Sequence, residues 1–145
     1  MKEDKKPLTL IGRREMVDLP DLDLLDVAAK IDTGAKTSSI HARETDHFVK
    51  DGQDWVRFLF DHHEGEEPQE CVMPLVGWRK ITSSNGHAQE RLIVRMRLNI
   101  AGQSFVTHFS LADRMKMRYP ILVGRRAMRH RFQVDPGRSW LQSPR

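Results

Sequence analysis

Val27-Ala-Ala-Lys-Ile-Asp32-Thr33-Gly34-Ala35 is a strand-like stretch that ends abruptly in an acid, a hydroxyl and a glycine. The apolar residues before Asp32 are typical of a β-strand, and an acid followed closely by glycine is typical of a turn. Asp-Thr-Gly alone allows two interpretations, because Asp and Gly are ordinary turn formers. It is either a plain strand-ending turn or a loop that presents the Asp32 carboxylate for chemistry.

Short segments with period-two alternation make up much of the remaining chain. Every second residue of 91–100 is apolar, which predicts a half-buried strand. After Ala101-Gly102-Gln103, the alternation resumes in residues 105–111, so the two segments predict a β-hairpin. Residues 55–60 and 71–76 predict two further strands.

Two shorter signals complete the expected fold. Asn85-Gly86 favours positive φ at both central turn positions, so residues 83–87 are predicted to be a hairpin tip. Pro120-Ile-Leu-Val-Gly124 is typical of a strand buried on both faces, and only residues 125–130 indicate a helix. We therefore expect an all-β domain over residues 8–145 with one short C-terminal helix, preceded by a flexible tail over residues 1–7.

The charges are distributed unevenly along the 145 residues. Residues 1–70 contain 10 Lys and Arg against 17 Asp and Glu, whereas residues 71–145 contain 14 against 3. A basic half is compatible with a nucleic-acid surface, but such residues are more often a solvated face or partners for the acidic half. We expect no membrane span and no nucleic-acid partner, and the basic half to attract an acidic ligand through Arg91, Arg95 and Arg97.

The order of these motifs resembles the retropepsins, single-domain aspartic proteases that work as homodimers. Asp32 to Ala35 resembles their active-site loop, and Ile121 to Arg125 resembles the strand and helix start beneath it. Three segments, residues 29–41, the Ser83-Ser84-Asn85-Gly86 turn and residues 132–139, carry a narrower resemblance over residues 8–140. It is to a bacterial family described as ATP-dependent zinc proteases and also as retropepsin-like. Its members are often associated with ATP-grasp ligases that add glutamates to a ribosomal protein, which implies such a partner here.

The resemblance implies a fold and a mechanism. The fold is a closed, barrel-like retropepsin domain, and the activity is that of an aspartic endopeptidase whose water is activated by Asp32 from each chain of a homodimer. Catalytic roles fall to Asp32, Thr33 and Gly34. The residues expected to bind substrate are Ala35, Lys36, Ser84, Asn85 and Gly86. Arg126 departs from the pattern, because retropepsins usually carry Asp or Asn there.

No cofactor or metal is expected from the residues themselves. The His-Glu-x-x-His zinc motif is absent, and Gly34-Ala-Lys-Thr37 lacks the glycine spacing of a phosphate-binding loop. Cys71, the only cysteine, excludes an internal disulfide and reads as a buried small hydrophobe. Together with the lack of an apolar signal segment, this predicts a cytoplasmic location.

A second functional class remains open alongside the peptidase. A fold does not determine a function, so the same dimer is compatible with a non-catalytic module that binds a protein or RNA partner of an ATP-grasp modification system.

Overall fold

The longest strands form where the sequence alternates most regularly. The computed structural model describes residues 7–62, 66–82, 86–114 and 118–143, and contains the expected hairpin of β8 (Ala88–Ile100) and β9 (Gln103–Ala112). Ala101 and Gly102 connect the strands with φ values of 52° and 76°, the left-handed conformation that a two-residue hairpin turn requires. The predicted hairpin is therefore confirmed.

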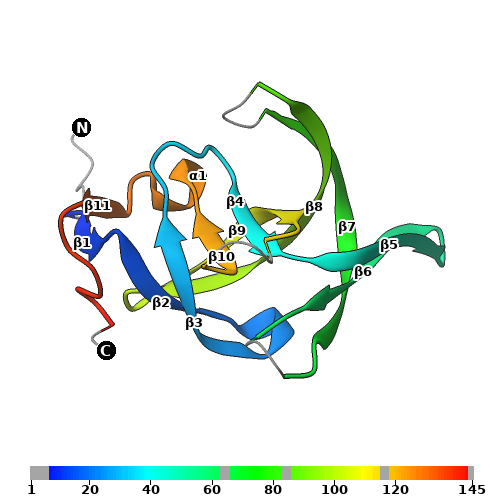
Figure 1. Ribbon diagram of the computed structural model, residues 1–145, viewed down its shortest axis with the longest axis horizontal. Coiled ribbons are helices and arrows are strands. Elements are labelled where there is room, and N and C mark those ends of the chain that lie inside the picture. The colour runs from blue at the N-terminus through cyan, green and yellow to red at the C-terminus, as the bar shows by residue number, and fades with distance from the viewer. Residues whose placement is uncertain (1–6, 63–65, 83–85, 115–117, 144–145) are drawn as a thin grey trace, which may run out of the picture.

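Nine strands form one sheet that closes on itself (Figure 1). The sheet follows the order β2-β3-β10-β4-β9-β8-β7-β6-β5, and an additional pairing of β2 with β8 closes six of its strands into a ring. The buried apolar side chains of these strands belong to one core cluster, to which other elements of the chain also contribute. The remaining elements of this sheet are β2 (Arg14–Leu19), β3 (Leu24–Ile31), β4 (Ser38–His41), β5 (Arg43–Lys50), β6 (Gln53–Phe60), β7 (Gln69–Thr82) and β10 (Ile121–Val123).

Two hairpins extend beyond the ring (Figure 1). The ends of β7 and β8 arch away from the ring as a long antiparallel pair, in register from Gly77 with Ile93 to Thr82 with Ala88. Its predicted tip includes residues 83–85, which lie outside the described part of the chain. The pair β5 and β6 projects in another direction.

A second, two-stranded sheet joins the two ends of the domain. β1 (Thr9–Gly12) pairs in parallel with β11 (Phe132–Asp135). The C-terminal segment beyond β11 is held by Glu15, whose fully buried carboxylate accepts hydrogen bonds from the backbone N–H groups of Gly12, Leu141 and Gln142. The last turns of the domain are therefore anchored on β2.

The fold is all-β with one short helix, α1 (Arg125–Met128), as the sequence predicts. A three-residue 3₁₀ turn, η1 (Pro20–Leu22), precedes β3. In the described residues no helix has the length and apolarity needed to cross a membrane. The predicted tail, residues 1–7, falls almost entirely outside the described residues.

Candidate functional site

The Asp32 loop links β3 to β4 and lies directly beside β10. Asp32 N–H donates to the carbonyl of Val123 at 2.9 Å, which extends the parallel pairing of β3 and β10 by one residue. The loop then turns tightly, because Ala35 N–H donates to the Asp32 carbonyl. The N–H of Gly34 also donates to Asp32 Oδ1 at 2.9 Å, which fixes the carboxylate at the turn.

Gly124 and the start of α1 hold the other side of the loop. Arg125 N–H donates to the carbonyl of Ala35 at 2.7 Å, and Arg126 N–H donates to that of Lys36 at 3.1 Å. Gly124 N–H donates to the buried Ser38 Oγ at 3.0 Å. The expected packing of an apolar strand, glycine and short helix against the Asp32 loop is therefore present.

The Asp32 carboxylate faces a cleft of about 1160 Å³. One wall is the Asp32 loop with α1, and the opposite wall is the arched end of the β7–β8 hairpin. Asp32 is the single acidic residue that lines the cleft among the described residues. Seven cationic side chains also line it: Lys36, Arg79, Lys80, Arg91, Arg114, Arg125 and Arg126.

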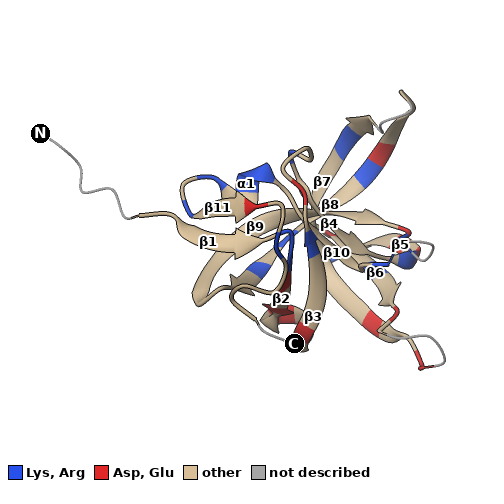
Figure 2. Cartoon of the chain, turned by 60° about the vertical axis from the view of Figure 1, so that its left-hand side comes forward, with Lys and Arg blue, Asp and Glu red and all other residues tan. Residues whose placement is uncertain are grey.

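Positively and negatively charged side chains gather in different regions of the molecule (Figure 2). Lys and Arg cluster on α1 and the β7–β8 hairpin, while many Asp and Glu lie around β2 and β3. Within the described chain, none of the ion pairs involves Asp32. The Asp32 carboxylate is thus surrounded by positive charge without being tied to one cation, which leaves it accessible to a ligand or to water.

Four of the predicted site residues line the cleft, and others do not. Gly34, Ala35 and Lys36 line it together with Asp32. Thr33 lines a separate depression beside α1, and its carbonyl accepts a hydrogen bond from Arg125 Nη1 at 3.1 Å.

Of the three substrate-binding residues predicted at the hairpin tip, the structure describes only Gly86. Ser84 and Asn85 lie outside the described residues, and Gly86 adopts the predicted positive φ of 83°. The adjoining residues His87, Ala88 and Gln89 line the cleft in place of Gly86. The hairpin thus reaches the site through the strand residues next to its tip.

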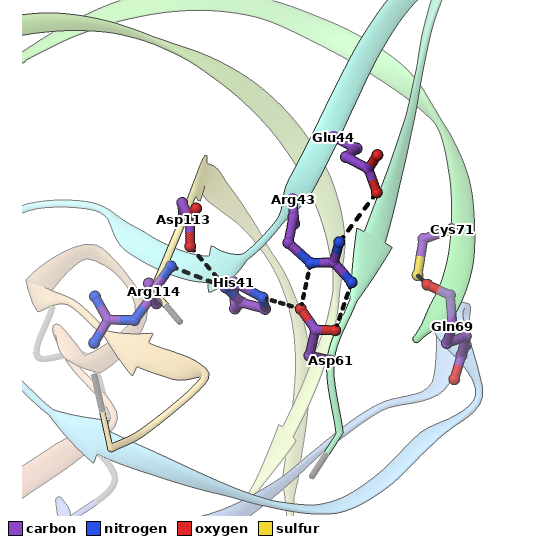
Figure 3. Close-up of polar contacts among 8 residues, drawn as sticks. All are labelled: His41, Arg43, Glu44, Asp61, Gln69, Cys71, Asp113 and Arg114. Carbon is purple, nitrogen blue, oxygen red and sulfur yellow. Dashed lines mark hydrogen bonds and ion pairs between the residues drawn. The ribbon is translucent and has the colours of Figure 1, made fainter. Parts of the chain in front are cut away.

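A partly buried polar network joins His41, Arg43 and Asp61 (Figure 3). His41 Nε2 is 2.6 Å from Asp61 Oδ2, and Arg43 donates to both Asp61 oxygens, at 3.0 and 2.9 Å. His41 Nδ1 accepts the backbone N–H of Arg114 at 2.8 Å, so the His41 proton resides on Nε2 and points to Asp61. The network therefore anchors the backbone at Arg114, whose side chain lines the cleft.

We expect this network to make stability depend on pH. Hydrogen bonds from Arg43, assisted by His41, lower the pKa of Asp61 from 3.8 to about 2. A depressed folded-state pKa stabilises the fold above the unfolded pKa, and this contribution is lost as pH falls from about 4 to 2. Asp61→Asn should lower the free energy of unfolding by about 1–2 kcal/mol at neutral pH, allowing for partial solvent exposure.

Urea unfolding of wild type and Asp61→Asn between neutral pH and pH 2 measures this effect. The difference between them should shrink toward zero at the acidic end. Asp51→Asn is the matched control, because Asp51 is exposed in a turn with a positive φ that Asn tolerates. A difference that stays constant down to pH 2 would show that Asp61 acts through packing instead of charge.

Several residues of the site carry no local sequence signal. Of the three arginines expected to attract an acidic ligand, Arg91, Arg95 and Arg97, only Arg91 lines the cleft, whereas Arg95 and Arg97 are exposed outside it. Arg114 and the His41–Asp61 pair were not predicted, since they meet through long-range strand pairing.

Two expectations concern metal and thiol chemistry. In the part of the chain that the structure describes, no group of three or more His, Cys, Asp or Glu side chains is placed to hold a metal ion. Cys71 is buried as predicted, and burial raises the pKa of its thiol to about 11. A thiolate nucleophile is therefore disfavoured at neutral pH.

Comparison with known proteins relates this architecture to one family. Residues 10–145 match the RimB-like family, described as the retropepsin-like aspartic endopeptidase RimB. A crystal structure of a protein of unknown function from Legionella pneumophila superposes with a TM-score of 0.76 at 26% identity, covering 92% of this chain and 98% of that one.

Longer proteins also contain a similar region. Two proteins named probable alpha-L-glutamate ligase, from Shewanella pealeana and Desulfotalea psychrophila, are each 33% identical to this chain over 133 and 129 residues. The matches cover 90% and 88% of this chain but 29% and 28% of the ligases. The chain thus spans less than a third of the length of these curated relatives.

Proposed function

The chain belongs to the RimB-like family of retropepsin-like aspartic endopeptidases, and from this premise we propose that it hydrolyses peptide bonds in acidic substrates. The observation that carries the proposal is the position of Asp32. Its carboxylate is fixed at a strand-ending turn, belongs to no ion pair in the described chain, and faces a cleft lined by seven cations.

The chemistry requires two carboxylates, and one chain supplies one Asp-Thr-Gly loop. We propose that Asp32 meets Asp32 of the partner subunit across a two-fold axis. The ionised carboxylate takes a proton from water, whose oxygen attacks the peptide carbonyl carbon, while the protonated carboxylate donates to the carbonyl oxygen. Proton transfer to the amide nitrogen then allows the C–N bond to break.

Each predicted residue has a place in this proposal. Thr33 lines the separate depression beside α1, where we propose that it hydrogen-bonds to the partner's loop, and Gly34 orients the Asp32 carboxylate through its N–H. Ala35 and Lys36 contact the substrate from the loop side. The substrate-binding role predicted for Ser84, Asn85 and Gly86 stays part of the proposal, because the adjoining His87, Ala88 and Gln89 line the cleft from the hairpin side.

The charge of the cleft supports an acidic substrate. A low-dielectric groove with one sign of charge concentrates ligands of the opposite sign. Relatives named as glutamate ligases make a chain of added glutamates a suitable substrate, so we propose that this protein acts alongside an ATP-grasp ligase on a glutamylated ribosomal protein.

A peptide library incubated with the purified protein and read by mass spectrometry tests the proposal. We expect cleavage within acidic peptides, with a KM that rises with salt as the charges are screened. Because no metal enters the proposed chemistry, a chelator should leave the rate unchanged. No cleavage of any peptide by a confirmed dimer would favour the alternative, a binding module for a protein or RNA partner.

A further inference from the structure

Three buried polar side-chain atoms of the described chain have no hydrogen-bond partner there, and two of them belong to residues that line the Asp32 cleft. They are Ser39 Oγ and Arg91 Nε; the third, Asn99 Oδ1, lies elsewhere. A buried polar atom without a partner costs about 1–3 kcal/mol, so such atoms are rare in folded proteins. Two such atoms beside one cleft are positions where an ordered water or a bound ligand can supply the partner.

Strand register explains why Ser39 faces the cleft. Ser39 pairs with Ser110 of β9 on one side and with Leu122 of β10 on the other, so the three side chains share one face of the sheet. All three line the cleft. Ser39 is 8% exposed, so only a small part of it reaches the cleft floor, and its hydroxyl oxygen is itself buried.

Two guanidinium groups border this floor. Arg91 comes from the arched part of β8, and Arg114 follows β9 and is only 9% exposed. Burial and the positive charge of Arg91 lower the pKa of Arg114, whereas the negative charge of Asp32 raises it. Two arginines and Asp32 are thus close enough to influence one another, with no ion pair joining them in the described residues.

The surroundings fix Arg114 in place. Its Nε donates to the carbonyl of Tyr119 at 3.1 Å, and its backbone N–H is held by His41, which Asp61 orients in turn. A guanidinium that is anchored before a ligand arrives loses little freedom on binding, which favours a specific contact. This anchoring distinguishes Arg114 from a freely solvated surface cation.

We propose that Arg91, Arg114 and Ser39 form a subsite that binds a carboxylate of the substrate beside Asp32. Two guanidinium groups and a hydroxyl donor match the acceptors of a carboxylate, and the ligand would partner the unsatisfied Ser39 and Arg91 atoms. The inference deepens the proposed peptidase function and rests on it. The carboxylate belongs either to an acidic side chain or to the C-terminus of the peptide.

Binding to the Asp32→Asn protein tests the subsite without requiring cleavage. The probes are a fluorescent peptide of consecutive glutamates with an amidated C-terminus, its glutamine counterpart, and the glutamine peptide with a free C-terminal carboxylate. In this background Arg114→Gln and Arg91→Gln should each raise the Kd of a carboxylate peptide about tenfold or more, and Ser39→Ala by a few fold. The amidated glutamine peptide should respond to none of them.

The pattern across probes identifies the source of the carboxylate. Tight binding of the amidated glutamate peptide assigns the subsite to an acidic side chain, and tight binding of the free-acid glutamine peptide assigns it to the C-terminus. Arg97→Gln is the matched control, because Arg97 lies on β8 but is exposed and hydrogen-bonded to Ser104 instead of lining the cleft. Circular dichroism confirms folding, and Arg91→Gln, at a less buried position, remains informative should Arg114→Gln unfold.

Equal loss of affinity for acidic and neutral peptides, or no loss with either arginine variant, would overturn the subsite. Charge-selective binding that depends on Arg91 and Arg114, without cleavage by the wild-type protein, would support the subsite and refute the peptidase. Cleavage of acidic peptides with a KM that both variants leave unchanged would support the peptidase and refute the subsite.

Discussion

An equal mixture of wild-type and Asp32→Asn chains, after full exchange, should cleave peptides at about one quarter of the rate of the same total of wild-type chains. Asn is nearly isosteric with Asp and can still accept the Gly34 N–H, so folding and dimerisation should persist. It cannot act as a base toward water, and the dyad needs one ionised and one protonated carboxylate.

The expected value follows from random pairing. Each proposed active site uses both chains, so one defective chain inactivates the dimer, and about one quarter of dimers keep two intact Asp32 residues. The measurement is cleavage rate against mutant fraction, once mass spectrometry of tagged chains confirms exchange. A quadratic fall supports the shared dyad, whereas a linear fall, with about one half of the rate at equal mixture, would show that each Asp32 works alone.

The fold could be predicted where structure follows from local pattern. Alternation in residues 91–100 and 105–111 fixes β8 and β9, because one face of each packs on the core and the other does not. Ser38-Ser39-Ile40-His41 shows no such alternation, yet it forms β4, buried between β9 and β10. Parallel pairing with β9 joins residues far apart in sequence, and no local pattern reports it.

The site, like the fold, has one part that local sequence predicts and another part that it does not. Asp32 and its glycine turn are visible as a motif, and so is the apolar strand that ends at Gly124. The cations around them depend on the long path of β8. Arg91 lies in the arched hairpin above the cleft, whereas Arg97 lies in the lower half, beside β9. Alternation assigns these residues to one face of a strand but does not say what that face meets along its length.

Gly124→Ala should reduce the rate of peptide cleavage about a hundredfold and lower the free energy of unfolding by about 1–3 kcal/mol. A Cβ at Gly124 would lie 2.8 Å from the carbonyl carbon of Thr37 and 2.9 Å from the carbonyl oxygens of Ala35 and Thr37. These neighbours are backbone atoms of the segment that carries Asp32, so the loop itself must shift. A displacement of about 1 Å in a catalytic group can reduce the rate about a hundredfold.

Substitutions at two other glycines distinguish a general loss of stability from a displacement of the Asp32 loop. A Cβ at Gly12 would meet the backbone of Arg138 at 2.7 Å, a comparable clash remote from Asp32, whereas at Gly137 the nearest atom is an ordinary contact at 3.4 Å. Gly12→Ala should therefore destabilise the fold yet cleave peptides at temperatures where it remains folded, and Gly137→Ala should do neither. Denaturant unfolding and cleavage rates of the three variants test this. Near wild-type cleavage by folded Gly124→Ala would show that close packing of β10 under the Asp32 loop does not set its catalytic geometry.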